Sequence, residues 1–254
     1  MTQAGIQISS VRAYLQTPAD VLASFRKVSA IGFRVIQIQW ISPEVPAEFI
    51  RAALAETGLT CAGTQDYYEV VTARLDEVIA MNDLWGSANI CVSGIPERCQ
   101  SEEGCLAFAD ELNALSRRLE QQGKILSFHP RYMDVIWFGR RNSLELILAN
   151  TRPEMQFVLD IYHLVRAGLD PLAWLELTRG RCDLVHFKDS TFAPDGSEAL
   201  VPTGQGRIAW EPVFRACAET GVKYGFAEQE SWQKDPFECL AESYAYMIGH
   251  GIEP

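Results

Sequence analysis

Short apolar segments of strand length alternate with longer amphipathic segments along the whole chain. Residues 5–9 (GIQIS) form an apolar run, and Val21, Leu22, Phe25 and Val28 then recur at the three- and four-residue spacing of a helix. The pattern predicts eight strands and eight helices. The predicted strands are 5–9, 34–40, 59–63, 88–94, 124–129, 155–160, 182–187 and 223–229; the predicted helices are 18–32, 43–58, 69–86, 101–123, 140–151, 170–180, 210–221 and 236–251.

Regular alternation of strands and helices indicates parallel βαβ units, which build either a closed barrel or an open doubly wound sheet. An open sheet usually carries a glycine-rich phosphate turn after its first strand, and residues 7–15 (QISSVRAYL) contain none. The G-x-G motif at Gly204 and Gly206 follows a loop. No low-complexity linker divides the chain. We therefore predict an α/β protein with a single (β/α)8 TIM barrel domain over residues 1–254.

Composition and charge agree with this class and exclude others. The chain has 254 residues, the usual size of such a barrel, with 48% hydrophobic and 22% charged residues. Its formal net charge of -11 opposes binding to nucleic acid, which requires clustered positive charge. No run of eighteen apolar residues is present, so we expect no membrane association.

The seven cysteines are scattered and include no C-x-x-C pair. An odd number without a metal-binding spacing predicts reduced cysteines that serve as small core residues. The N-terminal residues also lack the basic and apolar regions of a secretory signal. We therefore expect a cytoplasmic protein.

Four consecutive predicted strands each carry a polar residue that can bind a metal, at their last position or one before it: His129, Asp160, His186 and Glu228. In a (β/α)8 barrel the chemistry lies at the carboxyl ends of the strands, so these side chains could meet near the barrel axis. Two imidazoles and two carboxylates suit Mn²⁺, Mg²⁺, Co²⁺ or Zn²⁺. Structural roles are the alternative: a helix cap for Asp160, a buried histidine for His186, an ion pair for Glu228 and a loop contact for His129.

Further polar and aromatic residues follow these strand ends. His163, three residues after Asp160, could reach a substrate oxygen or a second metal, or be structural. Lys188 alternates with His186 and should face the same side, where it could bind substrate with Asp189 orienting it, or form a plain salt bridge with Asp189. The candidates for cavity walls are Tyr162, Trp40, Tyr132 and Trp137.

The order of motifs between residues 158 and 190, D-x-Y-H, G-x-D-P, G-R and H-F-K-D, resembles the sugar phosphate isomerase/epimerase family of xylose isomerase-like TIM barrels, which is related in fold to endonuclease IV. The resemblance implies one divalent metal ion, with Mn²⁺ favoured, bound by Asp160, His186 and Glu228. Members of this family isomerise or epimerise sugars and related hydroxy-ketones, and some dehydrate inosose. Many form pairs, which suggests a homodimer.

The chain departs from the family pattern at the end of the fifth strand, where many members have a ligating glutamate and this sequence has His129. An imidazole could replace that glutamate as a metal ligand or as a base. The inosose dehydratase branch is similar here, because it also has a His-Pro pair. The reaction type therefore stays open at this position.

We expect a metal-dependent isomerase or epimerase that removes an α-proton from a ketose, a sugar phosphate or a related hydroxy-ketone to form an enediolate. Glu228 is the expected base, His129 acts on the other face, and His163, Lys188, Tyr162 and Trp40 bind the substrate. The alternatives are an inosose dehydratase-like lyase and a non-catalytic barrel that binds a sugar or polyol. A nuclease is disfavoured by the net charge of -11.

Overall fold

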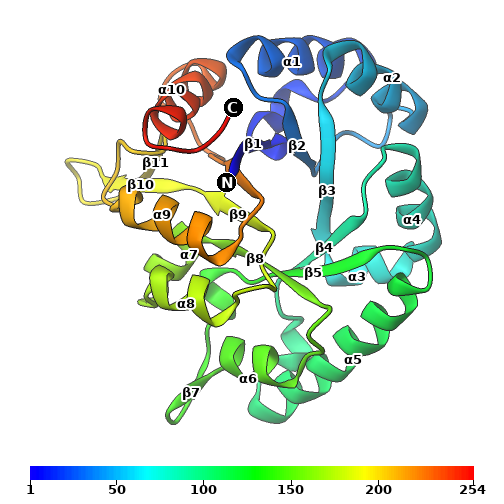
Figure 1. The fold of residues 1–254 in the computed structure, drawn as a ribbon, viewed down its shortest axis with the longest axis vertical. Coiled ribbons are helices and arrows are strands. Elements are labelled where there is room, and N and C mark those ends of the chain that lie inside the picture. Colours follow the sequence, from blue (N-terminus) through cyan, green and yellow to red (C-terminus); the bar gives the residue numbers. More distant parts are fainter.

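Eight parallel strands close into a barrel in the computed structural model, which describes residues 1–254 (Figure 1). Neighbouring strands pair in the order β1, β2, β3, β4, β5, β8, β9, β12, and β12 pairs again with β1. This arrangement confirms the predicted (β/α)8 barrel. The strands are β1 Gln3–Gln7, β2 Val35–Ile38, β3 Thr60–Tyr67, β4 Asn89–Ser93, β5 Ile125–His129, β8 Gln156–Asp160, β9 Leu184–Phe187 and β12 Tyr224–Ala227.

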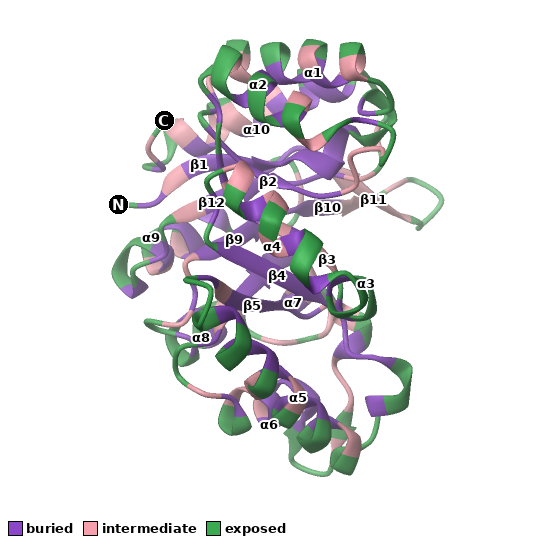
Figure 2. Ribbon diagram, turned by 90° about the vertical axis from the view of Figure 1, so that its right-hand side faces the viewer, coloured by how far each residue is buried: buried purple, intermediate pink, exposed green.

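Helices surround the barrel, with their exposed faces outward and the buried strands inside (Figure 2). Several of them begin at side chains that cap the free backbone N–H groups, such as Thr17 before α1, Ser101 before α5 and Asn142 before α6. None of the helices combines the length and hydropathy needed to span a bilayer. The α-helices are α1 Pro18–Ile31, α2 Ala47–Thr57, α3 Tyr68–Ala73, α4 Leu75–Leu84, α5 Glu102–Glu120, α6 Ser143–Asn150, α7 Ile161–Arg166, α8 Pro171–Leu177, α9 Trp210–Thr220 and α10 Pro236–Gly249; the 3-10 helices are η1 Ile8–Tyr14, η2 Glu97–Cys99 and η3 Tyr132–Asp134.

The structure differs from the predicted elements at several places. The predicted helix 69–86 is divided into α3 and α4, because Arg74 has non-helical backbone angles (φ -127°, ψ 31°). Helix α7 was not predicted. Nor were two antiparallel hairpins, formed by β6 (Trp137–Phe138) with β7 (Arg141–Asn142) and by β10 (Asp189–Phe192) with β11 (Glu198–Val201).

The core has two parts with different positions in the fold. A cluster of 55 buried residues includes the apolar faces of the helices. A separate cluster of five, Val35, Cys91, Val158, Leu184 and Phe226, has one member on each of five barrel strands. Because strand side chains alternate, the residue two positions after each member faces the same way. Those residues are all polar: Gln37, Ser93, Asp160, His186 and Glu228.

All seven cysteines are buried and unpaired, as predicted for small core residues. Burial raises the pKa of the Cys61 thiol to about 12, and it raises the pKa of Cys182 to about 12 as well. A thiol of this kind is protonated at neutral pH and is therefore a weak nucleophile. The cysteines thus have no part in the candidate site.

Candidate functional site

Polar side chains from four neighbouring strands converge at the carboxyl ends of the barrel strands. His129 and Asp160 are the last residues of β5 and β8, His186 lies in β9, and Glu228 follows β12 directly. These strands are adjacent in the order β5, β8, β9, β12. The alternation of strand side chains places Asp160, His186 and Glu228 as a polar layer above the apolar residues of the small cluster.

Asp160, His186 and Glu228 form a tight group of potential metal ligands. One atom from each lies within 4.8 Å of the other two. His186 Nδ1 is 2.8 Å from Glu228 Oε2 and 4.0 Å from Asp160 Oδ2, and all three atoms are buried. The only cation beside the two carboxylate oxygens is the Lys188 ammonium, and buried carboxylates require compensating positive charge, so the group can take up a further cation. The donor types of the three residues fit one divalent cation.

Gln37 fixes the orientation of the His186 ring. Its Oε1 lies 2.6 Å from His186 Nε2, and Gln7 donates a hydrogen bond to the same oxygen at 3.0 Å. The amide nitrogen of Gln37 donates to Gln65 Oε1 at 3.3 Å. An amide oxygen can only accept, so His186 carries a proton on Nε2, and its Nδ1 faces Asp160 and Glu228. Once Nδ1 is deprotonated, the ring can bind a metal through that atom.

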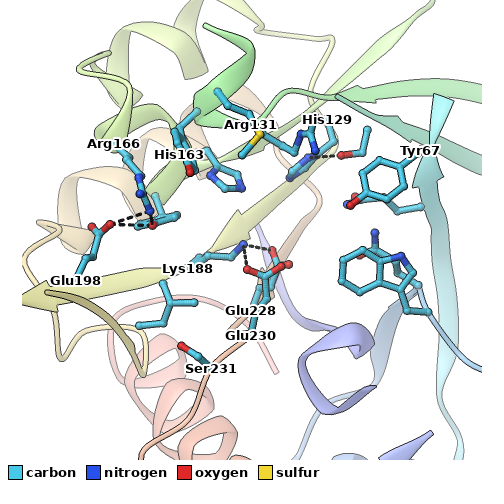
Figure 3. Close-up of a pocket in the computed structure, with 18 residues that line it drawn as sticks. Tyr67, His129, Arg131, His163, Arg166, Lys188, Glu198, Glu228, Glu230 and Ser231 are labelled. Carbon is cyan, nitrogen blue, oxygen red and sulfur yellow. Dashed lines mark hydrogen bonds and ion pairs between the residues drawn. The ribbon is translucent and has the colours of Figure 1, made fainter. Parts of the chain in front are cut away.

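Lys188 lies buried beside the donor group (Figure 3). Its Nζ is 3.2 Å from Asp160 Oδ2, 3.3 Å from Glu228 Oε2 and 3.2 Å from Glu230 Oε2. Burial alone would lower the pKa of Lys188, but the three carboxylates outweigh it and raise the pKa above its usual value. Burial would likewise raise the pKa of Glu228, but Lys188 and His186 lower it well below its usual range. Both groups are therefore charged at neutral pH.

His129 belongs to a second group of potential ligands, which it forms with Asp160 and His163. Its Nδ1 is 3.3 Å from Ser93 Oγ, and its Nε2 is buried without a partner. Burial lowers the pKa of His129 and of His163 well below the usual value, with further lowering by His186 and Lys188 respectively. Both imidazoles are therefore neutral at pH 7 and can accept a proton.

Asp160 has two roles at once. Its Oδ1 accepts a hydrogen bond from the backbone N–H of His163 at 3.0 Å and so caps helix α7, while its Oδ2 faces the donor group. The cap also places the His163 ring, whose Nε2 lies 3.7 Å from Asp160 Oδ2. The structural alternative for Asp160 is thus correct, and its other carboxylate oxygen still faces the site, where it pairs with Lys188.

A cavity of about 620 Å³ opens above these residues. All four of the predicted substrate-binding residues, His163, Lys188, Tyr162 and Trp40, line it, as do His129 and Glu228. The Tyr162 hydroxyl lies 3.0 Å from Glu198 Oε2 on the unpredicted β10–β11 hairpin, which therefore forms part of the wall. Tyr132 also lines the cavity, whereas Trp137 does not and is 56% exposed.

The prediction that Asp189 orients or pairs with Lys188 is wrong. Successive strand residues point to opposite faces, so Asp189 points away from the cavity. Its carboxylate accepts hydrogen bonds from the backbone N–H groups of Gly204 (3.1 Å) and Gly206 (3.0 Å) and from Trp210 Nε1 (2.7 Å). The G-x-G motif therefore binds an internal carboxylate rather than a phosphate.

Sequence reasoning missed many residues that line or support the site, among them Gln37, Glu230 and Glu198. The two-residue period of strand side chains could have revealed Gln37 and Glu230. Gln37 lies two positions after the inward-facing Val35 on β2, and Glu230 lies two positions after Glu228, which follows β12. Glu198 had no such signal, since the hairpin that carries it was not predicted.

Comparison with known proteins supports the fold and identifies the family. A solved sugar phosphate isomerase/epimerase from Parabacteroides distasonis is 18% identical, with a TM-score of 0.80 over 98% of this chain and 98% of that chain. An L-ribulose 3-epimerase is 16% identical, with a TM-score of 0.73 over 98% and 94%. A protein described as the probable 3-DHS dehydratase of Bacillus anthracis is 14% identical, with a TM-score of 0.73 over 99% and 100%.

At these identities the likeness establishes the fold alone, and curated proteins yield no significant sequence match. The family model described as a xylose isomerase-like TIM barrel matches residues 25–243, which is most of the sequence. The chain therefore belongs to the xylose isomerase-like TIM barrel family.

Proposed function

We propose that the protein is a metal-dependent isomerase or epimerase of a ketose, a sugar phosphate or a related hydroxy-ketone. The observation that carries this proposal is the group of three buried donor atoms, all within 4.8 Å of one another, beside a cavity of about 620 Å³. Asp160, His186 and Glu228 would hold one divalent ion, for which the family resemblance favours Mn²⁺. When bound, such an ion supplies Lewis acidity toward a substrate carbonyl.

Proton transfer is assigned to Glu228 and His129. Glu228 is ionised and His129 is neutral at pH 7, so each can accept the proton next to the carbonyl group. His129 ends strand β5 and Glu228 follows strand β12, and strands β8 and β9 lie between these two in the barrel. His129 and Glu228 therefore approach a central substrate from different sides. One group can therefore remove the proton and the other can return it on the opposite face, which inverts the carbon.

The remaining predicted residues bind and orient the substrate in this proposal. The Lys188 ammonium and the neutral His163 imidazole offer hydrogen bonds to substrate oxygens at the cavity floor. Tyr162 and Trp40 supply walls against which a sugar ring can pack. Burial raises the pKa of Glu230, although Lys188 acts in the opposite direction. Glu230 is therefore a further acid/base candidate.

Deuterium exchange tests the proposal directly. The protein, Mn²⁺ and a panel of ketoses and hydroxy-ketones are incubated in deuterated water, and the products are examined by NMR and mass spectrometry. We expect deuterium at the α-carbon of at least one substrate, and we expect a chelator to abolish the exchange. A non-catalytic sugar-binding barrel would bind panel members yet exchange none, and that result would exclude the proposed reaction.

A dehydratase is the second candidate function, and one observation favours it. The His129 and His163 rings lie 5.8 Å apart beside Asp160, so an imidazole that has removed the α-proton can deliver that proton to the departing hydroxyl group, which leaves as water. The same incubation distinguishes the two reactions, because a lyase releases one water and forms a new double bond, whereas an epimerase retains the substrate mass apart from deuterium.

The predicted homodimer and cytoplasmic location rest on the sequence and the family resemblance. Light scattering on the purified protein measures the first, and fractionation of the source cells measures the second.

A further inference from the structure

A second cavity, of about 280 Å³, adjoins the candidate site between strands β2 and β3 and helices α2 and α4. Ten of its 20 lining residues are hydrophobic, against six of 18 in the main cavity. On its wall, the charged Arg74 and Glu77 are hydrogen bonded to each other at 2.8 Å. This side cavity is thus the less polar of the two. Its apolar residues include Ile41, Val45, Ile50, Val78 and Met81.

The two cavities share a boundary. Gln39, Trp40 and Gln65 line both of them. Trp40 is the only residue other than glycine with a positive φ, at 56°. Bulky residues rarely adopt this conformation, because it costs on the order of 1–3 kcal/mol, and it persists where the surroundings enforce it, often beside a binding site. The strained residue therefore lies at the boundary between the two cavities.

We propose that the side cavity binds an apolar substituent, an aryl or short alkyl group, attached to the sugar that occupies the main cavity. A sugar ring needs the polar lining of the main cavity for its hydroxyl groups, and an apolar substituent gains by leaving water for the side cavity. The volume is sufficient, since an apolar cavity of about 150 Å³ can hold benzene. This inference depends on one part of the proposed function, namely that the main cavity binds a sugar.

The test compares methyl and phenyl β-D-glycosides of glucose, galactose and xylose, which differ within each pair only in the apolar group. Dissociation constants are measured by saturation-transfer NMR on the wild-type protein with Mn²⁺. We expect the phenyl member of at least one pair to bind at least about tenfold more tightly, in line with burial of most of one ring. Equal binding within all three pairs, or no binding at all, would overturn the proposal.

Variants locate the phenyl group. Met81→Phe should fill the side cavity and remove the preference for phenyl glycosides, while methyl glycosides should bind as before. If Met81→Phe does not fold, Ser42→Phe fills the cavity from another point of its lining and should have the same effect. Leu84→Phe is the matched control, because Leu84 lies on α4 outside the cavity lining. A preference that survives the filling variants would place the ring elsewhere and refute the inference.

Failure of the proposed reaction is a separate result. These glycosides have no ketone and need no turnover, so a phenyl preference lost in Met81→Phe supports the side cavity even if no ketose exchanges deuterium. Conversely, deuterium exchange with equal methyl and phenyl binding would support the proposed function and reject the side cavity.

Discussion

Replacing Gln37 by methionine tests whether this residue prepares His186 for metal binding. The change keeps the length of the side chain but removes the oxygen that lies 2.6 Å from His186 Nε2. A buried N–H group without its acceptor costs about 1–3 kcal/mol, part of which the ring can recover by turning and taking the other tautomer. A turned His186 ring no longer presents Nδ1 to Asp160 and Glu228, so the ring must turn back before a metal can bind.

The expected loss of metal affinity is about 10- to 100-fold, the usual effect of removing a partner that orients a metal-binding histidine. This corresponds to about 1.4–2.7 kcal/mol of binding free energy. Protein freed of metal by a chelator is titrated with Mn²⁺ and followed by calorimetry. Nitrogen NMR of the imidazoles provides an independent reading, because the His186 tautomer should change without any metal present.

Two further variants separate orientation from general damage. Gln37→Glu keeps an acceptor for His186 and should restore most of the affinity. Gln7→Met removes a donor to the same Gln37 oxygen without touching His186, so it should lower stability more than metal affinity. If Gln37→Met folds and binds Mn²⁺ as tightly as the wild type, the tautomer argument is incorrect.

Four other outcomes are expected. Glu228→Gln should fold but slow deuterium exchange by about 10²-fold or more, as for a lost general base, and unchanged exchange would remove Glu228 from the mechanism. Lys188→Met should lower the free energy of unfolding by about 3–5 kcal/mol, because it leaves buried carboxylates uncompensated. Added Mn²⁺ should then raise the melting temperature of the variant more than that of the wild type, and equal shifts in melting temperature would contradict this. Gly206→Ala places a Cβ 2.1 Å from Asp189 Oδ1 and should destabilise the fold by about 1–3 kcal/mol. Gly249→Ala, whose Cβ would have no neighbour within 4 Å, should not destabilise it, and similar melting temperatures for the two variants would show that the loop at Gly206 relaxes. The native protein should react negligibly with a thiol reagent at pH 8, and all seven cysteines should react after unfolding.

The sequence by itself determined the architecture and the strand ends at which the candidate site residues lie. Apolar runs of strand length and helical spacings are local signals, and their regular succession leaves few topologies for parallel units. The residues that close strands β5, β8 and β12 were found in the same way, because chain position places them at the carboxyl ends. The alternation of strand side chains also placed Lys188 on the side of His186.

Tertiary structure decided how these residues interact. Asp189 was misplaced because its partners, Gly204, Gly206 and Trp210, are supplied by a loop 15 to 21 residues further along the chain. Gln37 reaches His186 across 149 residues, and no local pattern records that contact. Periodicity specifies the face of an element on which a side chain lies, but the identity of its partner depends on how the barrel closes.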